Sequence, residues 1–90
     1  TILLKGKVDL ITDGTVVRGN ATGNAGMTVG GTGDVLAGIT GAFYCKASPL
    51  RAAVAAAFVN GTAGDLAFEV KGYSLLATDV IENIPRAMRL

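Results

Sequence analysis

The sequence predicts an α/β fold in which a strand and a β-hairpin come first, a glycine-rich loop follows, and three helices end the chain. Short β-rich runs occupy residues 2–18, residues 19–32 are glycine-rich without an apolar period, and apolar residues at helical spacing dominate the remainder. This order is typical of the end of an α/β domain, where helices pack against a sheet that lies mostly elsewhere.

The β-rich part of the chain is expected to form a strand and a hairpin. Residues 2–5 are an apolar run of the length expected for a buried strand. Residues 8–12 and 15–18 flank Asp13-Gly14, and an Asp-Gly pair between two β-rich runs predicts a hairpin. Residues 19–32 then form a long loop, and loops of this length in compact domains are usually functional.

The first two helices are expected over residues 34–46 and 50–68. Apolar residues give the first a broad apolar face, and alanines favour the second. Ser48-Pro49 precedes the second helix as a preferred N-cap and first helical residue. Gly38 and Gly41 form a smooth strip on the first helix. Gly61 and Gly64 are expected to interrupt the second helix and to pack closely against another helix or a nucleotide.

The end of the chain is expected to contain a turn and one more helix. Residues 69–73 form the turn. Thr78 or Asp79 then caps a short helix over residues 80–84, which stops before Pro85. Residues 86–90 are expected to form a tail.

The amino-acid composition is unusually apolar for so short a chain. Half of the 90 residues are hydrophobic and 17% are charged, which is apolar for so small a domain. We therefore expect one face to be covered by a missing N-terminal half of the domain or by a second copy in a homo-oligomer. The chain begins within a strand and without Met or a signal peptide, so it is expected to be a piece of a longer protein.

Charge and cysteine content exclude several partners. The net charge is +1 with no basic run, which argues against nucleic-acid binding, and no apolar run is long enough to span a membrane. Cys45 is the single cysteine and His is absent, so neither a disulfide framework nor a transition-metal site is expected. A reducing, cytoplasmic location follows as the default.

Gly30-Gly31-Thr32-Gly33-Asp34 is the most informative segment. Glycines allow positive φ and close approach to a ligand, and amides aligned at a helix start bind phosphate or another oxyanion. A carboxylate beside such an anion hole suits a general base. The alternative is that Asp34 merely caps the helix.

Four segments resemble one family. Lys5-Gly6-Lys7-Val8-Asp9 and residues 22–38, 60–65 and 75–81 are similar to the ADP-dependent NAD(P)H-hydrate dehydratases of the ribokinase-like superfamily. The resemblance extends over essentially the whole chain. It implies that residues 1–90 are the C-terminal part of a ribokinase-like, three-layer α/β/α nucleotide-binding domain.

The resemblance also implies an activity and a set of site residues. Family members dehydrate (S)-NADHX and (S)-NADPHX back to NADH and NADPH with ADP or ATP as co-substrate, and Mg²⁺ screens the phosphates. The implied catalytic base and substrate contact is Asp34, beside an anion hole formed by the amides of Gly31, Thr32 and Gly33. The implied nucleotide contacts are Lys5, Gly6, Lys7, Val8, Asp9, Gly33 and Asn60.

Two other functions stay open. A small-molecule kinase of the same superfamily, acting on a sugar or a vitamin precursor, would use the same base and anion hole. A nucleotide-binding or oligomer-forming module without catalysis is compatible with the short chain. A P-loop ATPase is disfavoured, because no Lys-Ser or Lys-Thr pair follows the glycines.

Overall fold

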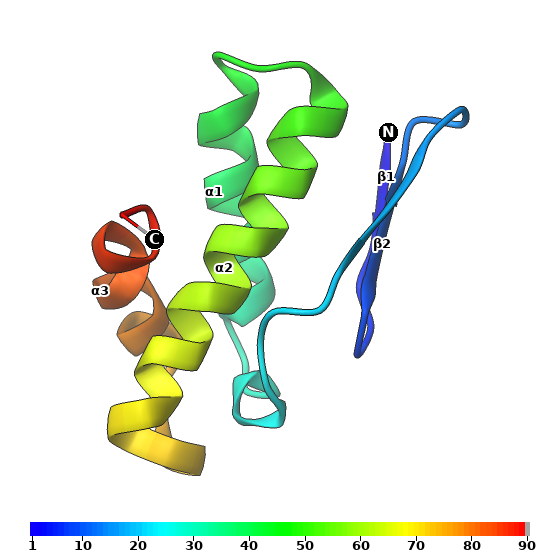
Figure 1. Ribbon diagram of the computed structural model, residues 1–90. Helices are drawn as coiled ribbons and strands as arrows, with labels where there is room; N and C mark the ends of the chain where they lie inside the picture. Colours follow the sequence, from blue (N-terminus) through cyan, green and yellow to red (C-terminus); the bar gives the residue numbers. More distant parts are fainter. Residues whose placement is uncertain (90) are drawn as a thin grey trace.

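The structure is a computed structural model that describes residues 1–89; Leu90, the last residue of the expected tail, lies outside the described residues. A three-stranded antiparallel sheet stands on one side of a group of three helices (Figure 1). The elements in chain order are β1 (Ile2–Leu4), β2 (Asp9–Thr12), β3 (Val17–Asn20), η1 (Ala25–Met27), α1 (Thr32–Tyr44), α2 (Pro49–Lys71), η2 (Gly72–Ser74) and α3 (Ala77–Ala87). The expected mixed α/β class and its order are confirmed.

The hairpin forms as expected but with a longer connection. Thr12 pairs with Val17, so four residues rather than two join β2 to β3. Asp13 Oδ1 accepts hydrogen bonds from the amides of Thr15 and Val16, both at 2.9 Å, and Gly14 has φ 94°. The Asp side chain thus closes a wider turn in place of a backbone ladder.

Strand β1 is not buried in the way its apolar sequence predicts. Leu3 is half-buried against the helices, whereas Ile2 and Leu4 are 65% and 61% exposed. Alternate residues of a strand face opposite sides of its sheet. Among the described residues, helices cover only one of those sides, so the apolar side chains on the other side stay uncovered.

Helix α2 is the centre of the packing. It packs on both α1 and α3 around the larger core, and its N-terminal half covers the inner face of the sheet (Figure 1). Ser48 is its N-cap, with Oγ accepting from the Arg51 amide at 3.4 Å, and Pro49 is its first residue, as expected. The larger core includes Val35, Leu36, Ile39, Val59, Leu66, Leu75 and Val80.

The expected interruption of α2 at Gly61 and Gly64 is wrong, because the helix is continuous from Pro49 to Lys71. The close approach at these glycines is present, but the partner is the glycine-rich loop rather than a helix or a nucleotide. A Cβ on Gly61 would overlap Thr22, and one on Gly64 would overlap the Met27 side chain. The loop therefore lies directly on the helix backbone.

Helix α3 is longer than predicted. It starts after Leu76, not at Thr78 or Asp79, and Asp79 in its first turn accepts a hydrogen bond from the Leu76 amide at 2.7 Å. It continues through Pro85 to Ala87, so part of the expected tail is helical. Pro85 is exposed in the last turn, where water can satisfy the carbonyl that the missing N–H leaves free.

Within residues 1–89, no helix combines the length and the hydropathy needed to cross a membrane.

Candidate functional site

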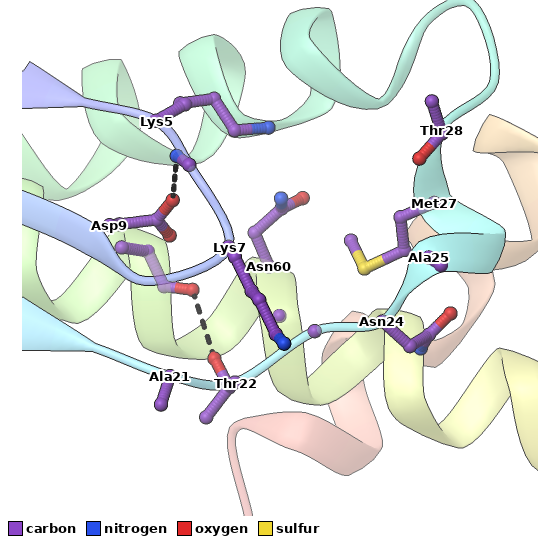
Figure 2. Close-up of a pocket in the computed structure, with 14 residues that line it drawn as sticks. Lys5, Lys7, Asp9, Ala21, Thr22, Asn24, Ala25, Met27, Thr28 and Asn60 are labelled. Atoms are coloured by element: carbon purple, nitrogen blue, oxygen red, sulfur yellow. Dashed lines mark hydrogen bonds between the residues drawn. The ribbon is translucent and has the colours of Figure 1, made fainter.

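A cavity of about 500 Å³ lies between the β1–β2 turn, the loop before α1, and the middle of α2 (Figure 2). Five of the predicted nucleotide contacts line it, namely Lys5, Gly6, Lys7, Asp9 and Asn60. The loop contributes Ala21, Thr22, Gly23, Asn24, Ala25, Met27 and Thr28, and α2 adds Ala57 and Gly61. The structure thus brings together three segments of the chain, of which the β1–β2 turn and α2 are far apart in the sequence.

The β1–β2 turn supplies the positive charge of this cavity. Both lysines are exposed, and Figure 2 shows Lys5 extending across the cavity and Lys7 along its near side. Asp9 is buried, and its two oxygens accept from the Gly6 amide and from Asn20 Nδ2, each at 3.1 Å. Asp9 therefore shapes the turn. Val8, also predicted as a nucleotide contact, is exposed and does not line the cavity.

Asn60 provides a polar group on the α2 side of the cavity. The residue is only 4% exposed, and its carboxamide points into the cavity (Figure 2). Its Oδ1 atom has no hydrogen-bond partner within the part of the chain that the structure describes. Buried polar atoms are nearly always paired, so this sealed, unpaired oxygen is an exception among the described residues.

The loop wall is tied to α2 by Asp65. Its carboxylate accepts from the Gly23 amide at 3.1 Å and from Asn24 Nδ2 at 2.8 Å. Asp65 was not among the predicted site residues, and its role here is to hold the loop against the helix. The available signal was its position next to Gly64, on a helix with close-packing glycines. Thr28 was missed as a lining residue, and no sequence signal identified it.

The start of α1 has a glycine N-cap and free backbone amides. Gly31 is the N-cap and has φ 103°, whereas Gly30 and Gly33 do not use positive φ. No acceptor among residues 1–89 pairs with the amides of Thr32, Gly33 or Asp34. These three free N–H groups lie at the positive end of the helix dipole, as an oxyanion site requires.

The Thr32 side chain connects this helix start to the first cavity. It is buried, and its hydroxyl donates to the Met27 carbonyl at 2.9 Å and to the Val29 carbonyl at 3.3 Å. Met27 itself lines the cavity. A displacement of the loop would therefore also shift the free amides of α1.

Asp34 lies in the first turn of α1, and the interpretation of it as an N-cap is wrong. It is exposed, and no hydrogen bond or ion pair joins its carboxylate to any described residue. With Gly31 it borders a second cavity of about 580 Å³ between α1 and α3. The rest of that lining is apolar and consists of Val35, Gly38, Ile39, Ala42, Phe43, Ala77, Ile81, Ile84 and Met88.

The predicted site residues thus fall into two neighbouring groups. The turn lysines, Gly6, Asp9 and Asn60 surround the first cavity, and Asp34 and Gly31 border the second. Thr32 connects the two groups through the hydrogen bond of its hydroxyl to the Met27 carbonyl. Gly33 is exposed and lines neither cavity. No cluster of three or more acidic, His or Cys side chains suited to a metal occurs among residues 1–89.

Known proteins resemble the chain over nearly its whole length. The bifunctional NAD(P)H-hydrate repair enzyme of Archaeoglobus fulgidus is 60% identical over 87 residues, which are 97% of this chain and 19% of that protein. The enzyme of the same name from Pyrobaculum aerophilum is 55% identical over 89 residues, 98% of this chain and 18% of that protein. The ADP-dependent (S)-NAD(P)H-hydrate dehydratase of Cenarchaeum symbiosum is 48% identical over 90 residues, 99% of this chain and 31% of that protein.

The chain therefore spans between 18% and 31% of the length of these relatives. A family model described as NAD(P)H-hydrate dehydratase matches residues 1–86. The resemblance found in the sequence is confirmed, and the chain belongs to the NAD(P)H-hydrate dehydratase family.

Proposed function

We propose that the chain is the C-terminal part of a ribokinase-like domain that dehydrates (S)-NADHX and (S)-NADPHX to NADH and NADPH. The observation that supports this most strongly is the unpaired Asp34 carboxylate in the same helical turn as three free amides. A carboxylate that only capped the helix would be bonded to those amides instead. Family membership and the names of the relatives supply the reaction.

We place the nucleotide co-substrate, ADP or ATP, in the cavity between the β1–β2 turn and α2. Lys5 and Lys7 supply ammonium groups for its phosphates, and Asn60 supplies a carboxamide on the opposite side (Figure 2). The name of the Cenarchaeum relative states ADP dependence. The cavity volume of about 500 Å³ lies within the range of small-molecule sites.

In the proposed reaction, Asp34 accepts the proton of the substrate hydroxyl. The terminal phosphoryl group of the nucleotide is transferred to that oxygen, and AMP leaves from ADP, or ADP from ATP. The amides of Gly31, Thr32 and Gly33 stabilise the negative charge that develops on the transferred group. Elimination of phosphate, with loss of a proton from the neighbouring ring carbon to solvent, then restores the double bond of the nicotinamide ring. The exposed position of Asp34 leaves its carboxylate accessible to the ring.

The described residues do not by themselves form a Mg²⁺ site. They contain no cluster of three acidic, His or Cys side chains, and both oxygens of Asp9 are already hydrogen-bonded. We therefore propose Mg²⁺ only as a counterion that the nucleotide phosphates hold through their own oxygens and water.

We further propose that the missing N-terminal half of the domain covers the apolar outer face of the sheet. Ile2, Leu4, Leu10 and Val17 are exposed there, and the chain spans less than a third of its relatives. A homo-oligomer is proposed as a second way of covering apolar surface. The free Cys45 is compatible with a reducing cytoplasm, which we propose as the location.

The Asp34→Asn variant tests the proposed base in the longer protein that contains this chain. The amide cannot accept the hydroxyl proton, so turnover of (S)-NADHX should fall by a factor on the order of 10²–10⁴. Nucleotide affinity, measured by calorimetry, should stay within about twofold. Glu69→Gln is the matched control, because Glu69 is an exposed carboxylate on α2 that lines neither cavity, and it should leave both values unchanged.

Two other outcomes would change the assignment. Undiminished turnover in the Asp34→Asn variant would contradict the role of Asp34. Accumulation of a phosphorylated sugar or vitamin precursor, with no recovery of NADH, would show a small-molecule kinase instead.

A further inference from the structure

We infer that the Thr32 side chain is a positioning group for the reaction, because it fixes the free amides at the start of α1 relative to the wall of the first cavity. The inference rests on the proposed function and adds a residue to it. Thr32 carries one of the three free amides, while its buried hydroxyl is hydrogen-bonded to the loop that lines the cavity.

The loop side of this connection is held by α2. Met27 packs against the larger core, and its side chain occupies the space that a Cβ on Gly64 would need. Met27 also lines the first cavity, and its carbonyl accepts from the Thr32 hydroxyl at 2.9 Å. The acceptor of this hydrogen bond therefore belongs to a residue that the helix keeps in place.

The helix side of the connection carries the proposed anion hole. Gly31 has φ 103°, and a Cβ on it would lie 2.9 Å from the Ala77 Cβ, so the N-cap packs closely on the start of α3. Thr32 follows as the first residue of α1. A rotation of its backbone would turn its own amide and the Gly33 amide, and would displace Asp34 in the same turn. A group that fixes the Thr32 backbone therefore fixes the direction of these donors.

The hydrogen bond of Thr32 differs from an ordinary helical threonine bond. Thr40, on the same helix, donates to the Leu36 carbonyl at 2.7 Å, one turn back within α1. The Thr32 hydroxyl instead reaches Met27 in η1 and, more weakly, the Val29 carbonyl at 3.3 Å. Within residues 1–89 it makes the one hydrogen bond between η1 and α1, and no backbone hydrogen bond joins these two elements.

The relative placement of the two elements matters because a phosphoryl group passes between them. In the proposed reaction this group leaves a nucleotide in the first cavity and is transferred to an oxygen beside Asp34, which borders the second. Donors act on the transferred group only where its charge develops, and a misplacement of about 1 Å can cost about 100-fold in rate. The Thr32 side chain touches neither reactant and acts through the amides that it orients.

Steady-state recovery of NADH from (S)-NADHX by the longer protein tests this inference, with calorimetry of nucleotide binding and thermal unfolding measured beside it. Thr32→Val keeps the shape of the side chain and removes the hydroxyl. The value of kcat should fall about 10- to 100-fold, because the amides are displaced rather than lost. KM for (S)-NADHX and the nucleotide affinity should stay within about twofold, as expected when an interaction made only in the transition state is weakened.

Three further variants separate positioning from a general loss of structure. Thr32→Ser keeps the hydroxyl and should restore most of kcat. Thr40→Val is the matched control, because it removes a hydroxyl of the same helix that bonds within α1, and it should leave kcat unchanged. Thr32→Ala also removes the hydroxyl, and it serves if Thr32→Val does not fold.

The outcomes separate this inference from the proposed function. A Thr32→Val variant that keeps the kcat of an active unchanged protein overturns the role of Thr32 and leaves the proposed function in place. The same follows if Thr32→Ser is as slow as Thr32→Val, or if kcat falls only in parallel with nucleotide affinity and unfolding temperature. An unchanged protein that restores no NADH overturns the proposed function, and this inference with it.

Discussion

Three aspartates in this chain have different roles because their surroundings differ. Asp9 is buried with both oxygens hydrogen-bonded, and Asp65 ties the loop to α2 through two hydrogen bonds. Asp34 alone of the three is exposed and unpaired within residues 1–89. Its carboxylate has no structural partner among the described residues, which is why we propose Asp34 as the catalytic residue.

Asp13 provides a test at the residue scale, through pH. The amides of Val16 and Thr15 donate to its carboxylate and lower its pKa below the ordinary value. The charged form is therefore favoured by folding, and its contribution to stability is present above about pH 3.9, the pKa of an unfolded aspartate. It is lost as the pH falls through the lower pKa of the folded state.

Urea unfolding of the unchanged longer protein and of Asp13→Asn, from pH 7 to pH 2.5, measures this effect. The unchanged protein should be the more stable at pH 7, and the difference should shrink below about pH 4. A difference that grew on acidification would contradict the hydrogen bonds assigned to the turn.

Residues with local partners were the easier ones to predict. Ser48 caps α2 through the amide of Arg51, three residues away, and this was expected. Asp65 bonds to residues 41 and 42 positions away, and no local pattern reports such a contact. Asn60 was expected near a nucleotide through the resemblance, but its burial and its unpaired oxygen emerge only in the folded chain.

At the scale of elements, the contact between α2 and the glycine-rich loop holds the site together. Gly61 and Gly64 allow Thr22 and Met27 to lie against the helix backbone. A glycine inside a helix costs about 1 kcal/mol relative to alanine, which is why an interruption was expected there. Packing of the loop and of the core offsets that cost, and the helix stays continuous.

Gly61→Ala should disturb this contact. Its Cβ would overlap the side chain and lie 2.7 Å from the backbone carbonyl carbon of Thr22, so the loop must move. We expect a loss of about 1–3 kcal/mol in the free energy of unfolding and weaker ADP binding. Gly41→Ala is the control: a Cβ there meets no described atom within 4 Å, and it should stabilise by about 0.5–1 kcal/mol.

Denaturant unfolding and calorimetry of both variants decide this point. A Gly61→Ala protein as stable as Gly41→Ala, with unchanged ADP affinity, would show that the loop does not depend on the glycine.

At the scale of the whole molecule, the 90-residue chain leaves apolar surface uncovered. Ile2, Leu4, Leu10 and Val17 are exposed on the outer face of the sheet, and a second apolar cavity lies between α1 and α3. Composition predicted an uncovered face, and the structure shows where it lies. The sequence did not reveal that β1 contributes to it, because an apolar strand has the same composition whether it is central or at an edge.

Sedimentation of the isolated 90-residue chain tests this feature. Exposed apolar surface should drive self-association at micromolar concentrations. Leu4 and Leu10 face each other across β1 and β2, so the double variant Leu4→Lys, Leu10→Lys should reduce the association. A stably folded, monomeric chain without these substitutions would contradict the proposal that this face is normally covered.

The complete site could not be predicted from this chain, because in our proposal it provides only a base, an anion hole and one side of a nucleotide cavity. The resemblance identified the family, and of its predicted nucleotide contacts Lys5, Gly6, Lys7, Asp9 and Asn60 line the cavity. The walls that would hold the nicotinamide ring belong, in our proposal, to the remainder of the domain.

In our proposal these residues are part of a nucleotide-dependent dehydratase. It is tested most directly by the recovery of reduced-nicotinamide absorbance from (S)-NADHX, with Mg²⁺ and either ADP or ATP, in the 90-residue chain and in the longer protein. We expect recovery in the longer protein with one of the nucleotides and none in the 90-residue chain. A folded longer protein that binds nucleotide and restores no NADH would contradict it.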